Sequence, residues 1–204
     1  MSNKENDSIP KNESGLQTDT ESSRDFDDAR QAEEFYQIAK KRLLHVNEWQ
    51  GLAGPATAGF SLTDENGKEV DRAVQEGDHF KIDIPGPGPA SGEGYDWVKV
   101  EAIVSQEGEA EAFTAITVRP APNPLSHKKD IAHFFSGEAT SSFVVKREKN
   151  KVTAGVYGRN EKPNTSSETT TDKVRNTAVA AGAMSGFSKI QWKSLVNGIL
   201  KSAA

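Results

Sequence analysis

Hydrophobic and polar positions along this chain of 204 residues follow two different periods. Between Asp28 and Trp49, apolar side chains recur at steps of three and four, which places them on one face of a helix. Asp27 and Asp28 stand where an N-cap is preferred, and Gly51 stands where helices commonly end. The pattern predicts an amphipathic helix over residues 28–49. Its apolar face carries Ala32, Phe35, Tyr36, Ala39, Leu43 and Val46.

From about residue 57 the period changes to two, which is typical of strands with one buried face. Asp64-Glu65-Asn66-Gly67 has the composition of a hairpin turn, so we expect a return strand around Val70 and Val74. Proline and glycine then separate further strand-like segments, of which residues 113–118 are apolar on both faces. The expected strands lie near residues 57–62, 79–84, 95–104, 113–118, 142–146 and 152–157.

The last third of the chain predicts helix again. A short helix is expected at residues 128–135, and residues 158–171 have the polar composition of a flexible loop. A final helix begins near Asp172 and is interrupted around residues 182–186, where glycines cluster. Its second half places four apolar side chains on one stripe. They are Trp192, Leu195, Val196 and Ile199.

The order of elements is therefore helix, several strands and helix, without the strand–helix–strand alternation of a doubly wound sheet. This order predicts an α+β fold. We expect a curved antiparallel sheet or a small open barrel of five to seven strands, flanked by an N-terminal and a C-terminal helix.

The first 28 residues differ in composition from the rest. They contain three basic and eight acidic residues, and only four apolar side chains. Such a segment buries too little surface to offset the entropy of ordering. We expect residues 1–28 to be a disordered acidic tail and residues 29–204 to be a single domain.

Charge is also uneven within that domain. Residues 29–127 have a balance of −7 and residues 128–204 a balance of +7, within a total of −5 for the chain. The distribution predicts pairing between the two halves, or masking of the basic half by the acidic tail.

Several classes of chemistry find no support in the composition. Without cysteine there is no disulfide, no thiolate metal site and no cysteine nucleophile. The histidines show no zinc-binding spacing, no G-x-S-x-G motif is present, and we expect neither a metal nor a cofactor. No apolar run approaches the ~20 residues of a membrane span. The opening MSNKENDSIP lacks the apolar stretch of a secretory signal, so we expect a cytoplasmic protein.

The most distinctive segment is the proline- and glycine-rich loop at residues 85–94. Loops carried by rigid strands often bind ligands, and glycine permits close approach of a backbone. The leading hypothesis is a non-enzymatic domain that contacts a protein or small-molecule partner through this loop and the aromatic strand edge beside it. The alternative is a wide turn beside a Trp97 buried in the core. The binding residues of the hypothesis are Pro87, Gly88, Tyr95, Asp96 and Trp97.

A second hypothesis concerns the small residues between 178 and 186, which let a helix pack closely on a sheet. The same small residues leave room for an internal cavity that binds a small apolar molecule. This second hypothesis includes an enzyme that acts through Asp83 or Asp96.

A third hypothesis is weak nucleic-acid binding by a basic hairpin with aromatic residues on its strands. The overall negative charge makes nucleic acid a disfavoured partner, and lysines at a hairpin tip also protect a sheet edge from aggregation. The sequence does not identify the oligomeric state or the ligand. The basic residues of this hairpin are Lys146, Arg147, Lys149 and Lys151.

Overall fold

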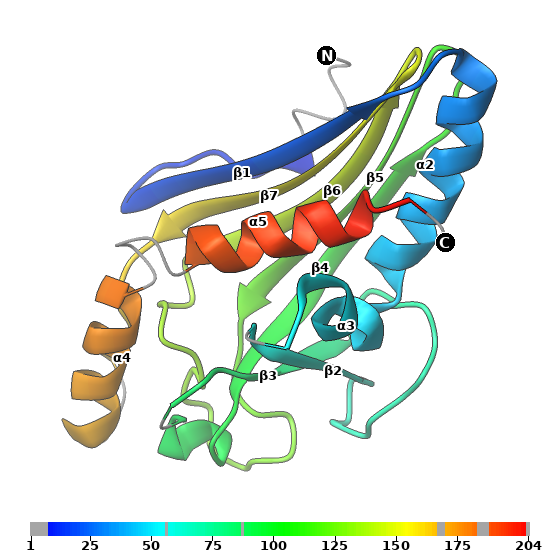
Figure 1. Ribbon diagram of the computed structural model, residues 1–204. Helices are drawn as coiled ribbons and strands as arrows, with labels where there is room; N and C mark the ends of the chain where they lie inside the picture. Colours follow the sequence, from blue (N-terminus) through cyan, green and yellow to red (C-terminus); the bar gives the residue numbers. More distant parts are fainter. Residues whose placement is uncertain (1–7, 56, 87, 167–169, 183–187, 203–204) are drawn as a thin grey trace.

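A curved sheet of seven strands forms the centre of the molecule (Figure 1). The computed structural model describes residues 8–55, 57–86, 88–166, 170–182 and 188–202. Neighbouring strands are antiparallel in the spatial order β1-β7-β6-β5-β4-β3-β2, with β1 and β2 at the two edges of an open sheet. The predicted α+β fold with an antiparallel sheet is therefore confirmed. The strands are β1 (Leu16–Asp25), β2 (Gly59–Thr63), β3 (His79–Asp83), β4 (Asp96–Gln106), β5 (Glu111–Pro120), β6 (Thr140–Glu148) and β7 (Lys151–Glu161).

Helices cover the concave face of this sheet. In Figure 1, α5 runs across the strands, α2 and α3 pack beside it, and α4 lies beyond the end of the sheet. None of the helices in the described part of the chain is long and apolar enough to cross a membrane. The helices are α2 (Ala29–Leu44), α3 (Trp49–Ala53), α4 (Thr170–Gly182) and α5 (Ser188–Ile199), with short 3-10 turns η1 (Val46–Glu48) and η2 (Ala90–Gly92).

The first predicted helix is confirmed as α2, and its apolar face is buried as expected. Asp28 is the N-cap, because its side chain accepts a hydrogen bond from the backbone N–H of Gln31 at 2.8 Å. The helix ends at Leu44, earlier than predicted. The chain then turns through η1, which carries Trp49 into the core, where its indole N–H donates to the carbonyl of Leu43 at 3.1 Å.

Trp49 is the centre of an aromatic cluster between the helices and the sheet. Its ring centroid lies 5.4 Å from that of Phe60, 5.6 Å from that of Phe80 and 4.7 Å from that of Phe143. These rings come from β2, β3 and β6, so one side chain joins strands that are far apart in the sheet. Each fully buried ring contributes about 1.5–3 kcal/mol through the hydrophobic effect.

The prediction that residues 1–28 are disordered is wrong for residues 16–25, which form β1 and pair with β7. The composition failed here because it measures how much side-chain surface a segment buries. Of the β1 side chains, Thr20 alone is buried, and the strand is held by backbone hydrogen bonds to β7. Residues 1–7 of the expected tail lie outside the described residues.

Three smaller predictions also differ from the structure. Residues 128–135 form no helix but an irregular segment, in which the N–H of Ala132 donates to the carbonyl of Ala121 at 3.0 Å. The expected return strand around residues 70–74 is reduced to a single bridge between Thr63 and Glu69. Residues 158–161, expected in a loop, continue β7.

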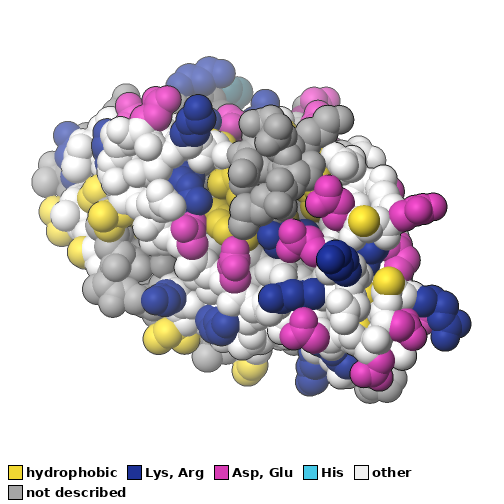
Figure 2. Space-filling model, turned by 90° about the horizontal axis from the view of Figure 1, so that it is seen from above, with side chains coloured by type: hydrophobic (Ala, Val, Ile, Leu, Met, Phe, Trp, Pro, Cys, Tyr) yellow, Lys and Arg dark blue, Asp and Glu magenta, His cyan; other side chains and the backbone are white. Residues whose placement is uncertain are grey.

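The two oppositely charged halves of the chain meet in ion pairs. Arg147 binds Glu33 of α2 at 2.6 Å, and Arg175 binds Asp96 of β4 at 2.5 Å. The N-terminal segment takes part as well, since Asp19 of β1 binds Arg159 at 2.5 Å. On the face drawn in Figure 2, acidic and basic side chains are intermingled rather than separated into two fields.

Candidate functional site

A cavity of about 80 Å³ lies between the concave face of the sheet and helices α4 and α5. Its wall is mostly apolar. The strands from β2 to β7 all contribute side chains to it, together with the segment 133–135. The lining residues are Phe60, Phe80, Ile82, Ile84, Val98, Val118, His133, Phe134, Phe135, Ser141, Phe143, Glu161, Val179, Gln191 and Trp192.

Aromatic rings form much of this wall. Trp192 of α5 lies edge-on to Phe143 of β6, with centroids 5.4 Å apart and planes at 79°. The same indole is 6.1 Å from Phe60 of β2. Val179 supplies the contact from α4, and it is half-buried. Two different helices thus contribute to the wall opposite the strands.

Glu161 reaches the cavity because β7 contains a bulge. Thr18 of β1 faces Gly158, whereas Leu16 faces Glu161, so β7 advances three residues while β1 advances two. The extra residue passes through Asn160, which has a positive φ of 56°. Side chains alternate across a strand, and one inserted residue reverses that alternation. The bulge therefore turns Glu161 to the face of the sheet that Gly158 occupies.

The carboxyl group of Glu161 is held over a glycine. The side chain is 6% exposed, and one carboxyl oxygen, Oε1, accepts a hydrogen bond from the hydroxyl of Thr18 at 3.1 Å. A methyl group added at Gly158 would overlap this oxygen and the Thr18 hydroxyl, so the missing side chain makes room for both. Burial raises the pKa of Glu161 above its ordinary value, because the charged form loses hydration.

His133 is the second titratable group in the wall, and it is neutral. Its Nδ1 accepts a hydrogen bond from the backbone N–H of Phe135 at 2.9 Å, which places the ring hydrogen on Nε2. Burial lowers the pKa of His133 to about 4. The ring stacks on Phe134, with centroids 4.3 Å apart and planes at 23°.

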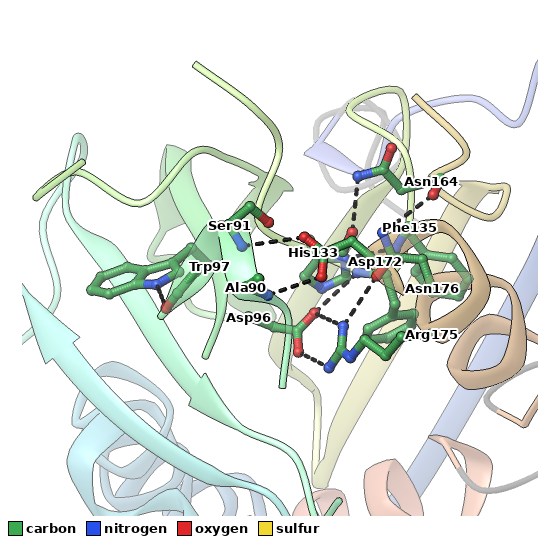
Figure 3. A network of polar contacts seen from close by, with 12 residues as sticks. Ala90, Ser91, Asp96, Trp97, His133, Phe135, Asn164, Asp172, Arg175 and Asn176 are labelled. Carbon is green, nitrogen blue, oxygen red and sulfur yellow. Dashed lines mark hydrogen bonds and ion pairs between the residues drawn. The ribbon is translucent and has the colours of Figure 1, made fainter. Parts of the chain in front are cut away.

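A buried ion pair fixes α4 to the sheet next to His133 (Figure 3). The guanidinium of Arg175 binds the carboxylate of Asp96 with both terminal nitrogens, at 3.1 and 2.5 Å. Asp96 also accepts a hydrogen bond from the backbone N–H of Phe134 at 3.0 Å. One carboxylate thus holds a helix and the segment that carries His133.

Two further side chains complete this polar network. Asp172 of α4 accepts hydrogen bonds from the backbone N–H groups of Ala90 at 2.9 Å and Ser91 at 3.2 Å (Figure 3). Asn164 donates to the carbonyls of Ile131 and His133 at 3.0 and 3.1 Å. The network therefore ties the proline- and glycine-rich loop, the segment before β6 and α4 into one unit at the end of the cavity.

The structure does not bring the predicted loop residues together as an open binding edge. Asp96 and Trp97 are buried, and the indole N–H of Trp97 donates to the carbonyl of Gly92 at 3.2 Å. Tyr95 is half-buried, with the ammonium of Lys81 4.2 Å from its ring centroid. Gly88 packs against the backbone of Gly94, and Pro87 lies outside the described residues.

The basic hairpin likewise does not present its four cations on one surface. Arg147 is buried, bound to Glu33 and donating to the carbonyls of Gly108 and Glu109 at 2.7 and 3.0 Å. Lys146 is 7% exposed. Lys149 and Lys151 are exposed near the tip. Cations already bound inside the fold are poorly placed to contact phosphates.

Sequence reasoning pointed to a cavity beneath residues 178–186, and Val179 does line one; residues 183–187 lie outside the described residues. It missed Glu161 and His133. The two carboxylates considered for catalysis, Asp83 and Asp96, are not among the lining residues. The sequence signal for Glu161 was weak, because it is only an acidic residue at the end of an apolar strand. The direction of its side chain depends on a bulge that the sequence does not reveal.

Comparisons with known proteins add a general likeness. A scan against protein-family models and a search of curated proteins each found no match. Among solved structures, Ara h 8.0201 is 14% identical and has a TM-score of 0.41, with coverage of 92% of this chain and 100% of the other. A truncated norcoclaurine synthase from Thalictrum flavum is 10% identical with a TM-score of 0.35, covering 84% of this chain and 95% of the other.

A ginseng major latex-like protein from Panax ginseng is 16% identical with a TM-score of 0.34, covering 83% of this chain and 96% of the other. These scores and identities are low.

Proposed function

We propose that this protein binds a small, largely apolar molecule in the cavity between the sheet and helices α4 and α5. The observation that carries the proposal is the composition of the wall, in which aromatic and aliphatic side chains surround unfilled space and only four residues are polar, namely His133, Ser141, Glu161 and Gln191. Interiors are normally packed without such space, and concave apolar pockets with a few placed polar groups are the usual form of ligand sites.

The volume limits the size of the ligand. A water-sized group needs ~10–15 Å³, so a cavity of about 80 Å³ holds several such groups. Pockets for drug-sized ligands are larger, at ~300–1,000 Å³. The proposal is therefore for a short aliphatic molecule, or for one end of a longer ligand whose remainder extends past Val179 at the wall formed by α4.

Filling the cavity tests this proposal. The phenylalanine of Val179→Phe would occupy space at the α4 wall, and we expect it to weaken pentane binding at least tenfold. The matched control is Val174→Phe on the same helix, where the valine is 67% exposed and the substitution should leave binding unchanged. Binding is measured by titrating ¹⁵N-labelled protein with pentane and following amide shifts of the lining residues.

Wild-type protein whose lining amides do not respond to pentane would contradict the proposal. Equal weakening by both substitutions would also contradict it, because the effect would then not pass through the cavity.

A further inference from the structure

Glu161 gives the cavity a carboxyl group with no cationic side chain beside it in the wall. Of the lining residues, His133 and Glu161 are the titratable ones, and His133 is held neutral at physiological pH. No lysine or arginine of the described chain lies in the wall. When Glu161 is ionised, the cavity therefore carries a single negative charge.

The nearest candidate counter-ion is already in use. Arg159 precedes the bulge and binds Asp19 at 2.5 Å on the neighbouring strand, and no ion pair to Glu161 is found among the described residues. Within that same part of the chain, the second carboxyl oxygen, Oε2, receives no hydrogen bond, while Oε1 binds Thr18. A buried carboxylate that forms no ion pair is costly, and a cation brought by a ligand would offset that cost.

Two local features aim this carboxylate into the cavity. The inserted residue at Asn160 turns Glu161 inward, and the absent side chain at Gly158 leaves the space that the carboxyl occupies. Bulges often re-aim a side chain beside a functional site. If the carboxyl group of Glu161 served only to accept the hydrogen bond from Thr18, it would not need to face an apolar cavity.

The rest of the wall suits a cation with an apolar body. The faces of Phe60, Phe143 and Trp192 are electron-rich and attract an ammonium group, most strongly in a desolvated site. The neutral His133 adds no repulsion. An alkyl chain would meanwhile lie against the aliphatic residues of β3 to β5.

From these observations, and resting on the proposed function above, we propose that the ligand is a small amine whose protonated nitrogen binds the carboxylate of Glu161 while its alkyl or aryl part fills the cavity. The site would prefer amines over alcohols and hydrocarbons of the same size.

The test compares butylamine, 1-butanol and pentane. The three molecules are similar in size and differ in one terminal group, which is an amine, a hydroxyl or a methyl group. At pH 8 we expect wild-type protein to bind butylamine at least tenfold more tightly than 1-butanol, measured by amide shifts in ¹⁵N-labelled protein. Glu161→Gln keeps an acceptor for Thr18 but removes the charge, and it should abolish this preference. Gly158→Ala retains the carboxyl but displaces it, and it should reduce the preference as well.

The matched control is Glu138→Gln, which removes an exposed carboxylate bound to Lys162 at 3.2 Å and should leave the preference unchanged. Lowering the pH should weaken butylamine binding, because Glu161 becomes protonated at a higher pH than an ordinary glutamate while the amine stays charged. The charged groups that act on Glu161 are Arg159 of β7 and Asp19 of β1.

The outcomes separate the two proposals. Wild-type protein that binds pentane and 1-butanol but shows no preference for butylamine would overturn the amine assignment and leave the apolar cavity standing. Failure of all three probes would overturn the proposed function itself. An amine preference that survives Glu161→Gln would show that another group receives the cation. Because the comparison of probes uses wild-type protein, it holds even where a variant fails to fold.

Discussion

At the scale of single residues, stability depends on the buried ion pair between Asp96 and Arg175. Both side chains are at least nine-tenths buried, and the pair holds α4 against the end of β4. Two charges removed from water gain stability only while both are present, because each compensates the other.

Asp96→Asn should therefore destabilise the protein by about 3–5 kcal/mol, since it removes the carboxylate that both terminal nitrogens of the buried Arg175 bind. Urea unfolding followed by circular dichroism measures this loss. The control lies on the same strand: Glu101 binds Arg119 at 2.6 Å with both side chains about one-third exposed. Glu101→Gln should cost less than 1 kcal/mol. Equal effects of the two substitutions would contradict the assigned role of burial.

The sequence could not have assigned Asp96 to this role. It placed Asp96 beside a proline- and glycine-rich loop and an aromatic strand, where an exposed carboxylate is as reasonable as a buried one. Its partner is 79 residues further along the chain. Trp97, which the leading hypothesis placed on an open strand edge, is buried against Gly92 of η2, whereas Val98 and Val100 are the β4 side chains in the core under the helices. Periodicity within an element is local, whereas a pairing between elements depends on the fold.

At the scale of elements, β1 shows what hydrophobic patterning does not detect. The strands from β2 to β7 carry alternating or continuous apolar residues, and the sequence predicts all of them approximately. β1 is a polar edge strand that pairs with β7 from Leu16 to Asp25 and also supports the bulge from outside. An edge strand has one neighbour and needs few buried side chains, so composition assigned it to disorder.

Deleting residues 1–25 should destabilise the protein strongly and cause self-association, because the full length of β7 would become an unpaired edge. Deleting residues 1–7 leaves β1 whole and should change neither property. Thermal unfolding and sedimentation velocity measure the two effects. A shortened chain without β1 that remained monomeric and equally stable would show that β1 contributes little to the sheet.

At the scale of the whole molecule, burial of His133 makes stability depend on pH. An unfolded histidine binds a proton near pH ~6.5, whereas burial lowers the pKa of folded His133 to about 4. Below pH ~6.5 the unfolded state therefore binds more protons than the native state, and the native state is penalised. The stability contribution is intact above that pH and declines as the pH falls toward 4.

Between pH 6.5 and 4 this histidine alone should reduce the free energy of unfolding by roughly 3 kcal/mol, at 1.36 kcal/mol for each pH unit. Denaturant unfolding across this range measures the slope. The pKa of His79 is also lowered by burial and acts in the same direction, so the comparison must be with His133→Gln. That variant should lose the His133 share of the slope; an unchanged slope would contradict the argument.

The bulge in β7 is held from outside the cavity. Asn160 accepts hydrogen bonds from the backbone N–H groups of Glu13 and Ser14 at 2.8 and 3.0 Å, and its own N–H donates to the side chain of Asn12 at 2.7 Å. The aim of Glu161 is therefore set by a short polar stretch that touches no ligand. If the proposed amine site holds, substitutions at residues 12–14 should change the selectivity between amines and neutral molecules without changing the volume or lining of the pocket.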